Sequence, residues 1–151
     1  MNSTARLTVF ADYGQFYLLD SEVLPEYPER VEDQHLEDRF QLAPGLIAVY
    51  PTETQQVEVE IETVDSEPVI DPETWQHIIQ CSIETPSGSL VLASCSDYLP
   101  NCPRVPTFKG QCGVIILGKN LGQSSGESYR FYIWPAKAPI TKIIKRYGAT
   151  A

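Results

Sequence analysis

Apolar residues along this chain recur mostly with a period of two, which is typical of β-strands with one buried face. The clearest example is the stretch 57–64, where Val57, Val59 and Ile61 alternate with glutamates. Further short apolar runs lie between turn-forming residues, and we expect strands at 7–10, 15–20, 46–50, 77–83, 90–95, 113–118, 129–134 and 140–147. The turn residues 86–89 predict that the strands at 77–83 and 90–95 pair as a hairpin.

This pattern predicts an all-β fold, a two-sheet antiparallel β-sandwich with at most one short helix. Residues 30–40 are expected to form this short helix, which would place Val31, Leu36 and Phe40 roughly on one side. At 151 residues the chain has the length of one domain. We therefore expect a single β-sandwich domain over 1–151, with a loop insertion at about 96–112 and a basic C-terminal strand at about 137–147.

Charge divides the chain into two unequal halves. Residues 1–75 carry seventeen Asp and Glu against three Arg and no Lys, whereas residues 76–151 carry three acids against eight Lys and Arg. A charge distribution of this kind governs partner choice and association rate rather than fold. The acidic half would repel DNA phosphates and membrane head groups and attract a basic protein or a cation. The alternative is a solvated acidic surface that only keeps the protein soluble.

Three glutamates occupy one face of the strand at 57–64. Residues two apart on a strand are separated by about 6.6 Å, so Glu58, Glu60 and Glu62 form an evenly spaced row. Two functions suit such a row, namely docking of a basic protein and partial mimicry of a nucleic-acid backbone. The structural alternative is the polar outer face of an amphipathic strand, or charge that protects a sheet edge from aggregation.

A second acidic stretch covers residues 22–38 and would extend this surface if it packs near the row. The candidate partner-binding residues are therefore Glu53, Glu58, Glu60, Glu62, Glu29, Glu32 and Asp33. The expected partner is a basic protein, with no direct binding of nucleic acid and no insertion into a membrane.

The chain shows no pattern that indicates catalysis, a cofactor or a metal site. The four cysteines contain no C-x-x-C pair, and no calcium loop, nucleophile elbow or phosphate-binding glycine loop is present. In the expected hairpin, Cys81 and Cys95 face the core as small hydrophobic residues, while Cys102 and Cys112 flank a proline-rich loop and could pair when oxidised. No signal peptide or membrane-spanning run is evident, so a cytoplasmic location is expected.

Several local patterns occur in the order found in the ComJ family of competence-associated inhibitors of a DNA-entry nuclease. They are the strand Tyr13-Gly14-Gln15-Phe16-Tyr17-Leu18-Leu19-Asp20, the glycine-led strand 44–49, the stretch 57–61 and the late strand 126–136. Over residues 7–136 the chain therefore resembles that family. The resemblance implies a β-sandwich that binds and inhibits a nuclease, but it carries no residue-level inhibitory motif to this sequence. The loop 96–112 and the basic tail 137–146 depart from the family pattern.

Together, charge and resemblance predict a non-enzymatic acidic protein that occludes the phosphate-binding surface of a basic partner, most simply a DNA nuclease. The alternative is a β-sandwich module that binds a small molecule, a carbohydrate or a metal ion. That alternative requires a concave pocket lined by Tyr129, Tyr132 or Trp134.

Overall fold

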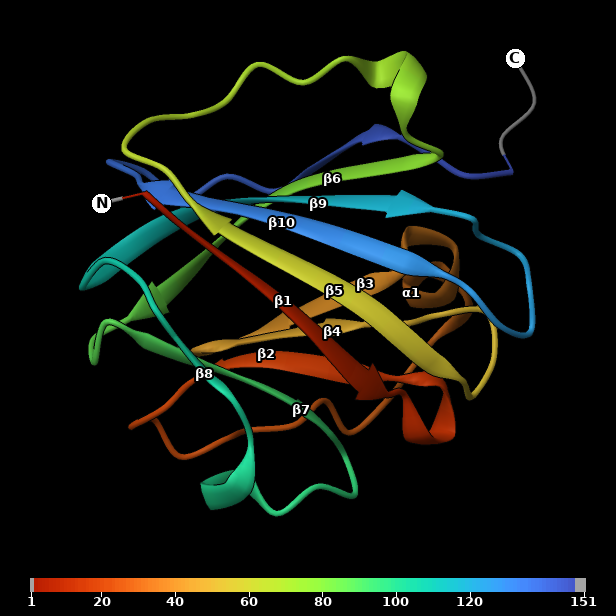
Figure 1. Cartoon of the computed structure of the whole chain (residues 1–151), viewed down its shortest axis with the longest axis horizontal. Coiled ribbons are helices and arrows are strands. Elements are labelled where there is room, and N and C mark those ends of the chain that lie inside the picture. The colour runs from red at the N-terminus through yellow and green to blue at the C-terminus, as the bar shows by residue number, and fades with distance from the viewer. Residues whose placement is uncertain (1, 149–151) are drawn as a thin grey trace.

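The computed structural model describes residues 2–148, which form two β-sheets packed face to face (Figure 1). The six-stranded sheet contains, in spatial order, β1 (Ser3–Phe10), β5 (Gln56–Thr63), β10 (Ser128–Pro135), β9 (Gly110–Lys119), β6 (His77–Thr85) and β11 (Lys142–Lys145). The five-stranded sheet contains β3 (Phe40–Ala43), β4 (Leu46–Val49), β2 (Phe16–Asp20), β7 (Ser89–Ser94) and β8 (Arg104–Pro106). The predicted all-β, two-sheet fold is confirmed.

The helical content is small, as expected. The one α-helix among residues 2–148 is α1 (Asp33–Asp38), which is shorter than the predicted helix 30–40. Val31 precedes its N-cap, and Phe40 already belongs to β3 because Arg39 ends the helix in the left-handed region at φ 64°. Three short 3-10 turns cover Asp12–Gly14, Pro72–Thr74 and Leu99–Asn101. The sequence reading missed the short strands β3 and β8, since four-residue and three-residue strands are too brief to show a period.

Strand pairing is antiparallel with one exception. β10 lies parallel to β5, so that Arg130 stands opposite Glu60, and it runs antiparallel to β9 on its other side. A parallel neighbour must come from a distant part of the chain, because a short turn cannot connect parallel strands. The partner of β5 therefore cannot be identified from local sequence.

The predicted hairpin of 77–83 with 90–95 is wrong. β6 pairs with β9 and β11 in one sheet, whereas β7 pairs with β2 and β8 in the other. The chain crosses between the sheets at 86–88, where the buried carboxylate of Asp20 accepts hydrogen bonds from the hydroxyls of Thr85 and Ser87 at 2.8 and 2.7 Å. Residues 86–88 therefore form a turn that is held by Asp20 and leads from one sheet to the other, not the turn of a hairpin.

This crossing also separates the two cysteines that were expected to face the core of the hairpin, and the expectation is wrong for Cys95. Cys81 is buried in β6, whereas Cys95 follows the end of β7 and is exposed. All four cysteines are free thiols. Burial raises the pKa of Cys81 to about 12 and that of Cys112 to about 11, so both remain protonated at neutral pH and behave as small core side chains.

The main core lies between the sheets and follows the alternation seen in the sequence. Val57, Val59 and Ile61 of β5 point inward, and the ring of Phe16 in β2 meets that of Tyr129 in β10 edge-on, with 5.7 Å between centroids. Each such aromatic pair contributes about 0.5–1.5 kcal/mol beyond the area it buries. The carboxylates that alternate with these β5 residues consequently project from the outer face of the six-stranded sheet.

One half of that outer face is covered. The loop over residues 64–76 passes across the sheet (Figure 1), and its Ile70 and Trp75 pack on a small apolar cluster of Ile78, Ile115, Leu117 and Trp134. Gly113 permits this packing, because a Cβ atom there would lie 2.4 Å from Cε2 of Trp134. The outer face of β1, β5 and the adjoining part of β10 stays open, and this open part carries the glutamates.

Candidate functional site

The three glutamates of β5 form a row on the open part of the six-stranded sheet, as the alternation predicted. β5 is flanked by β1 and β10, so the row lies inside the sheet rather than at an edge. Glu58 is exposed, whereas Glu60 and Glu62 are half-buried by their neighbours. Protection of a sheet edge is therefore not the role of these charges in the folded protein.

Arginines of the two neighbouring strands neutralise most of the row. Arg6 of β1 and Arg130 of β10 stand opposite Glu60 on its two sides. Arg6 Nε lies 3.4 Å from a carboxylate oxygen of Glu60, and Arg130 reaches Glu60 at 3.1 Å and Glu62 at 2.8 Å. The Thr4 hydroxyl also donates to Glu62. Pairs this exposed contribute about 0–1 kcal/mol each, so their main effect is to cancel charge.

A groove of ≈ 700 Å³ runs over this region and is lined by charges of both signs. Its charged side chains are those of Arg6, Lys119 and Arg130, which are basic, and of Glu58 and Glu60, which are acidic. Glu58 alone among the three glutamates forms no ion pair within residues 2–148. The row is thus a nearly neutral surface with one unpaired carboxylate, not a uniform strip of negative charge.

The second acidic stretch has the opposite character. Over residues 22–37 it carries six carboxylates and one arginine, and all six are exposed: Glu22, Glu26, Glu29, Glu32, Asp33 and Glu37. None of the six forms an ion pair within the part of the chain that the structure describes. We call residues 22–37 the acidic segment. Its negative charge is available to a partner.

The acidic segment does not extend the glutamate row into one face. The ring of Tyr27 in the segment lies 4.9 Å from that of Tyr17. Tyr17 belongs to the cluster on the outer face of the five-stranded sheet, since its neighbours Phe16 and Leu18 face the core. The middle of the segment and the row therefore lie on opposite outer faces of the sandwich. Of the remaining candidates, Glu53 is exposed in the β4–β5 loop.

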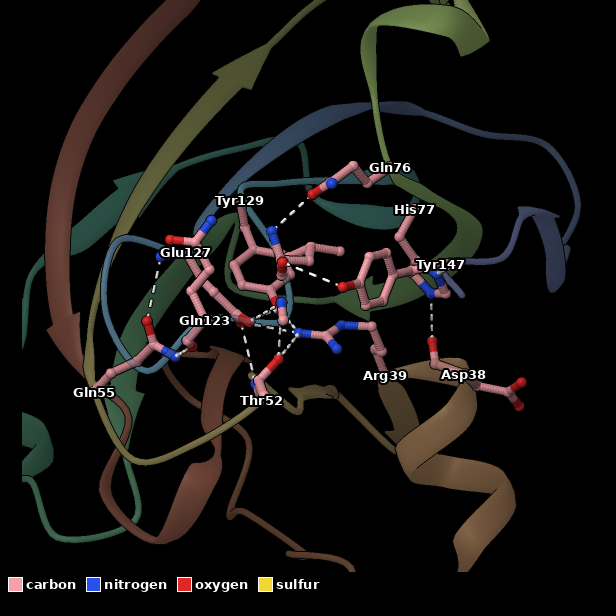
Figure 2. A network of polar contacts seen from close by, with 12 residues as sticks. Asp38, Arg39, Thr52, Gln55, Gln76, His77, Gln123, Glu127, Tyr129 and Tyr147 are labelled. Atoms are coloured by element: carbon pink, nitrogen blue, oxygen red, sulfur yellow. Dashed lines mark hydrogen bonds and ion pairs between the residues drawn. The ribbon is translucent and has the colours of Figure 1, made fainter. Parts of the chain in front are cut away.

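A buried polar network fixes the end of the acidic segment to both sheets (Figure 2). Arg39, the residue after α1, is 7% exposed and donates from Nη2 to Glu127 at 2.9 Å, to the Tyr129 hydroxyl at 2.8 Å and to Thr52 at 3.3 Å. The Glu127 carboxylate is fully buried and also accepts from the backbone amides of Thr52 and Gly122. Removing one member of a buried ion pair typically costs 3–5 kcal/mol.

His77 provides a second connection between α1 and the six-stranded sheet. The backbone amide of Tyr147 donates to its Nδ1 at 2.9 Å, and this fixes the tautomer in which Nε2–H donates to the Asp38 carbonyl oxygen at 2.7 Å. Burial, with the nearby Arg39 and Arg146, lowers the pKa of His77 to about 4. His77 is therefore neutral at physiological pH and holds the C-terminal end of α1 in place.

The rings expected to line a small-ligand pocket offer little surface to a ligand. Tyr129 borders the groove described above and Trp134 borders a second hollow, but they are only 3% and 5% exposed and pack in apolar clusters. Tyr132 lies under the Arg130 guanidinium at 4.9 Å. Among residues 2–148, no three His, Cys, Asp or Glu side chains meet in a way that could hold a metal ion. No helix in the same range has the length and apolar composition needed to span a membrane.

Comparison with known proteins defines the fold class. No protein-family model matches the chain, and no match is found among curated proteins. Among solved structures, the fold is similar to that of ComJ from Bacillus subtilis, described as an inhibitor of the DNA degrading activity of NucA. The TM-score is 0.72 at 12% identity, over 90% of this chain and 99% of that chain. The product of crocagin biosynthetic gene J is also similar, with a TM-score of 0.64 at 14% identity, over 91% and 98% of the two chains.

The structural similarity confirms that the chain has a ComJ-like fold, as the order of its strand patterns predicted. At this level of identity the likeness establishes the fold alone. The function must be argued from the surfaces described above.

Proposed function

We propose that this protein is a non-enzymatic inhibitor that binds a basic protein, most simply a DNA nuclease, and covers its phosphate-binding surface. The observation that carries the proposal is the acidic segment on a ComJ-like fold. Its six exposed carboxylates form no ion pair with any of residues 2–148. The ComJ structure is described as an inhibitor of DNA degradation by NucA, and a shared fold makes the same class of partner the first to test.

The mechanism is competition for cationic groups. A nuclease holds DNA phosphates with Lys and Arg, and those groups can bind other anionic groups when DNA is absent. Carboxylates of the acidic segment, among them Glu29, Glu32 and Asp33, would occupy these groups and exclude the substrate. Long-range attraction between the two surfaces would mainly raise the association rate and would weaken with salt.

The glutamate row is expected to contribute less to docking. Glu60 and Glu62 already have arginine partners, so a nuclease lysine would have to replace an existing ion pair rather than form a new one. Glu58 and Glu53 remain candidates for contact because they are exposed and form no ion pair among the described residues.

The test is to immobilise the protein at low salt, pass a lysate of its source organism over it and elute with rising salt. A basic protein that elutes as one species, degrades DNA alone and stops doing so when the protein is added back would support the proposal. Recovery of no protein with nuclease activity, or of an unselective mixture of basic proteins, would overturn it and reduce the acidic segment to a solubility feature.

A further inference from the structure

We propose that α1 and the residue before its N-cap form the anchor of the docking surface, with Val31 and Leu36 inserted into an apolar depression of the basic partner. The inference rests on the proposed function and deepens it. Three observations support it: the two apolar side chains are exposed, carboxylates flank them in sequence, and α1 is held on a fixed support.

Val31 and Leu36 are 44% and 52% exposed. Glu32 is the N-cap of α1 and forms a capping box with His35, so Val31 precedes the cap and Leu36 is the fourth helical residue. These are the two positions that a hydrophobic staple joins at the start of a helix. Two apolar side chains are thus placed at one end of α1 and leave about half of their area in water.

Carboxylates flank this pair in sequence on both sides. Glu29, Glu32, Asp33 and Glu37 are all exposed and without ion pairs among the described residues. Interfaces commonly place apolar anchors at the centre and charged groups at the rim, where the anchors set the dissociation rate and the rim sets the association rate. The surface near α1 offers both apolar side chains, Val31 and Leu36, and exposed carboxylates next to them in the sequence.

The support beneath α1 is fixed before any partner arrives. The Arg39 guanidinium joins it to Glu127, His77 holds the Asp38 carbonyl, and Arg146 forms an ion pair with the Asp38 carboxylate. Ordering side chains and loops on binding opposes association. Because these three contacts already hold α1 in place, little conformational entropy of its backbone is lost when a partner binds.

The negative charge around α1 indicates which kind of protein binds there. A second copy of this chain docking through the same patch would bring two acidic surfaces into contact, and like charges across an interface disfavour the complex. A basic protein has the complementary charge. The inference therefore commits to the surface of a basic protein, with self-association left as an outcome that would contradict it.

The experiment uses the nuclease captured and purified as described above. The variant Val31→Ser/Leu36→Ser removes the apolar anchor without changing charge. We expect its dissociation rate to rise about 10- to 100-fold, while its association rate stays within about twofold of wild type. The matched control is Val69→Ser, which removes a fully exposed apolar side chain from the loop 64–76, outside the acidic segment. This control should change neither rate.

A folding control and a rescue variant keep the test decisive. Circular dichroism and thermal unfolding show whether α1 survives the double substitution, and Val31→Ile/Leu36→Met, which keeps the anchor apolar, should restore slow dissociation. Unchanged dissociation of the serine variant would overturn the inference while leaving the proposed function intact. A wild-type protein that binds no nuclease would overturn the proposed function itself. If the wild-type protein forms a dimer and the serine variant does not, the occupant of this surface is a second copy of the chain, and the inference of a basic partner is overturned.

Discussion

The glutamate row and the acidic segment are similar in sequence but opposite in structure. In the row, Glu60 and Glu62 find cations on the neighbouring strands, and the groove above them carries both signs of charge. In the acidic segment, six exposed carboxylates find none within residues 2–148. The difference shows that the density of acids in a sequence does not measure the charge a surface offers. What counts is whether the counter-ion lies inside the molecule or must come from a partner.

Glu127 is the extreme case of a carboxylate with internal partners, and its removal should have the largest effect. We expect Glu127→Gln to lower the free energy of unfolding by about 3 kcal/mol or more, because the buried Arg39 loses its counter-ion. Urea denaturation measures the change. Glu58→Gln is the control, and its effect should stay within about 0.5 kcal/mol. Equal effects of the two substitutions would contradict the distinction between internal and available carboxylates.

Charge reversal of the acidic segment should have the next largest effect, but on binding rather than on stability. Replacing Glu26, Glu29 and Glu37 by Lys should lower the association rate with the captured nuclease about 100-fold at low salt and flatten its salt dependence. Stopped-flow or surface-binding kinetics at several salt concentrations give both quantities. An association rate that keeps its wild-type value and salt slope would mean that the segment does not steer the partner.

Acid should weaken the fold through His77, which holds α1. Its pKa is near 6.5 when unfolded and is lowered to about 4 in the fold. The unfolded state therefore binds more protons between these values, and stability is lost as pH falls through this window. The expected loss from this residue is about 2 kcal/mol between pH 7 and pH 5. Denaturation curves of wild type and His77→Gln would measure it, and parallel pH profiles of the two proteins would exclude His77 as the cause.

Neutralising the glutamate row should have the smallest effect. The triple change of Glu58, Glu60 and Glu62 to Gln should lower stability by about 1 kcal/mol, since only partly exposed pairs with Arg6 and Arg130 are lost. The association rate should stay within about threefold of wild type. If the rate instead falls as far as it does after reversal of the acidic segment, the row is the docking surface after all.

Sequence reasoning was reliable where information is local. The period of two identified the main strands and placed the three β5 glutamates on an outer face, both as observed. The position of the helix was found, although its extent was not: of Val31, Leu36 and Phe40 only Leu36 lies in α1. These features depend on residues that are only a few positions apart in the chain, so they can be predicted from one sequence.

It failed where a distant residue decides the outcome. The turn 86–89 suits a hairpin and a crossing between sheets equally well, and the choice is made by Asp20 of β2. The neutralisation of Glu60 depends on Arg130, which reaches it only because β10 lies parallel to β5. The contact of Arg39 with Glu127 joins residues that are 88 positions apart. Contacts between residues so far apart in the chain cannot be predicted from a local sequence pattern.

The position of β10 also has a consequence for how the chain reaches its native state. β10 fills the gap between β5 and β9, so the inner edge of β5 has no neighbour until the chain has been made as far as residue 135. Pairings between distant segments form slowly, and an unpaired apolar strand is prone to aggregate during that delay. Three evenly spaced glutamates on β5, not yet neutralised by Arg130, would keep such strands apart. The charges that matter least to the finished surface would then serve as gatekeepers while the protein folds.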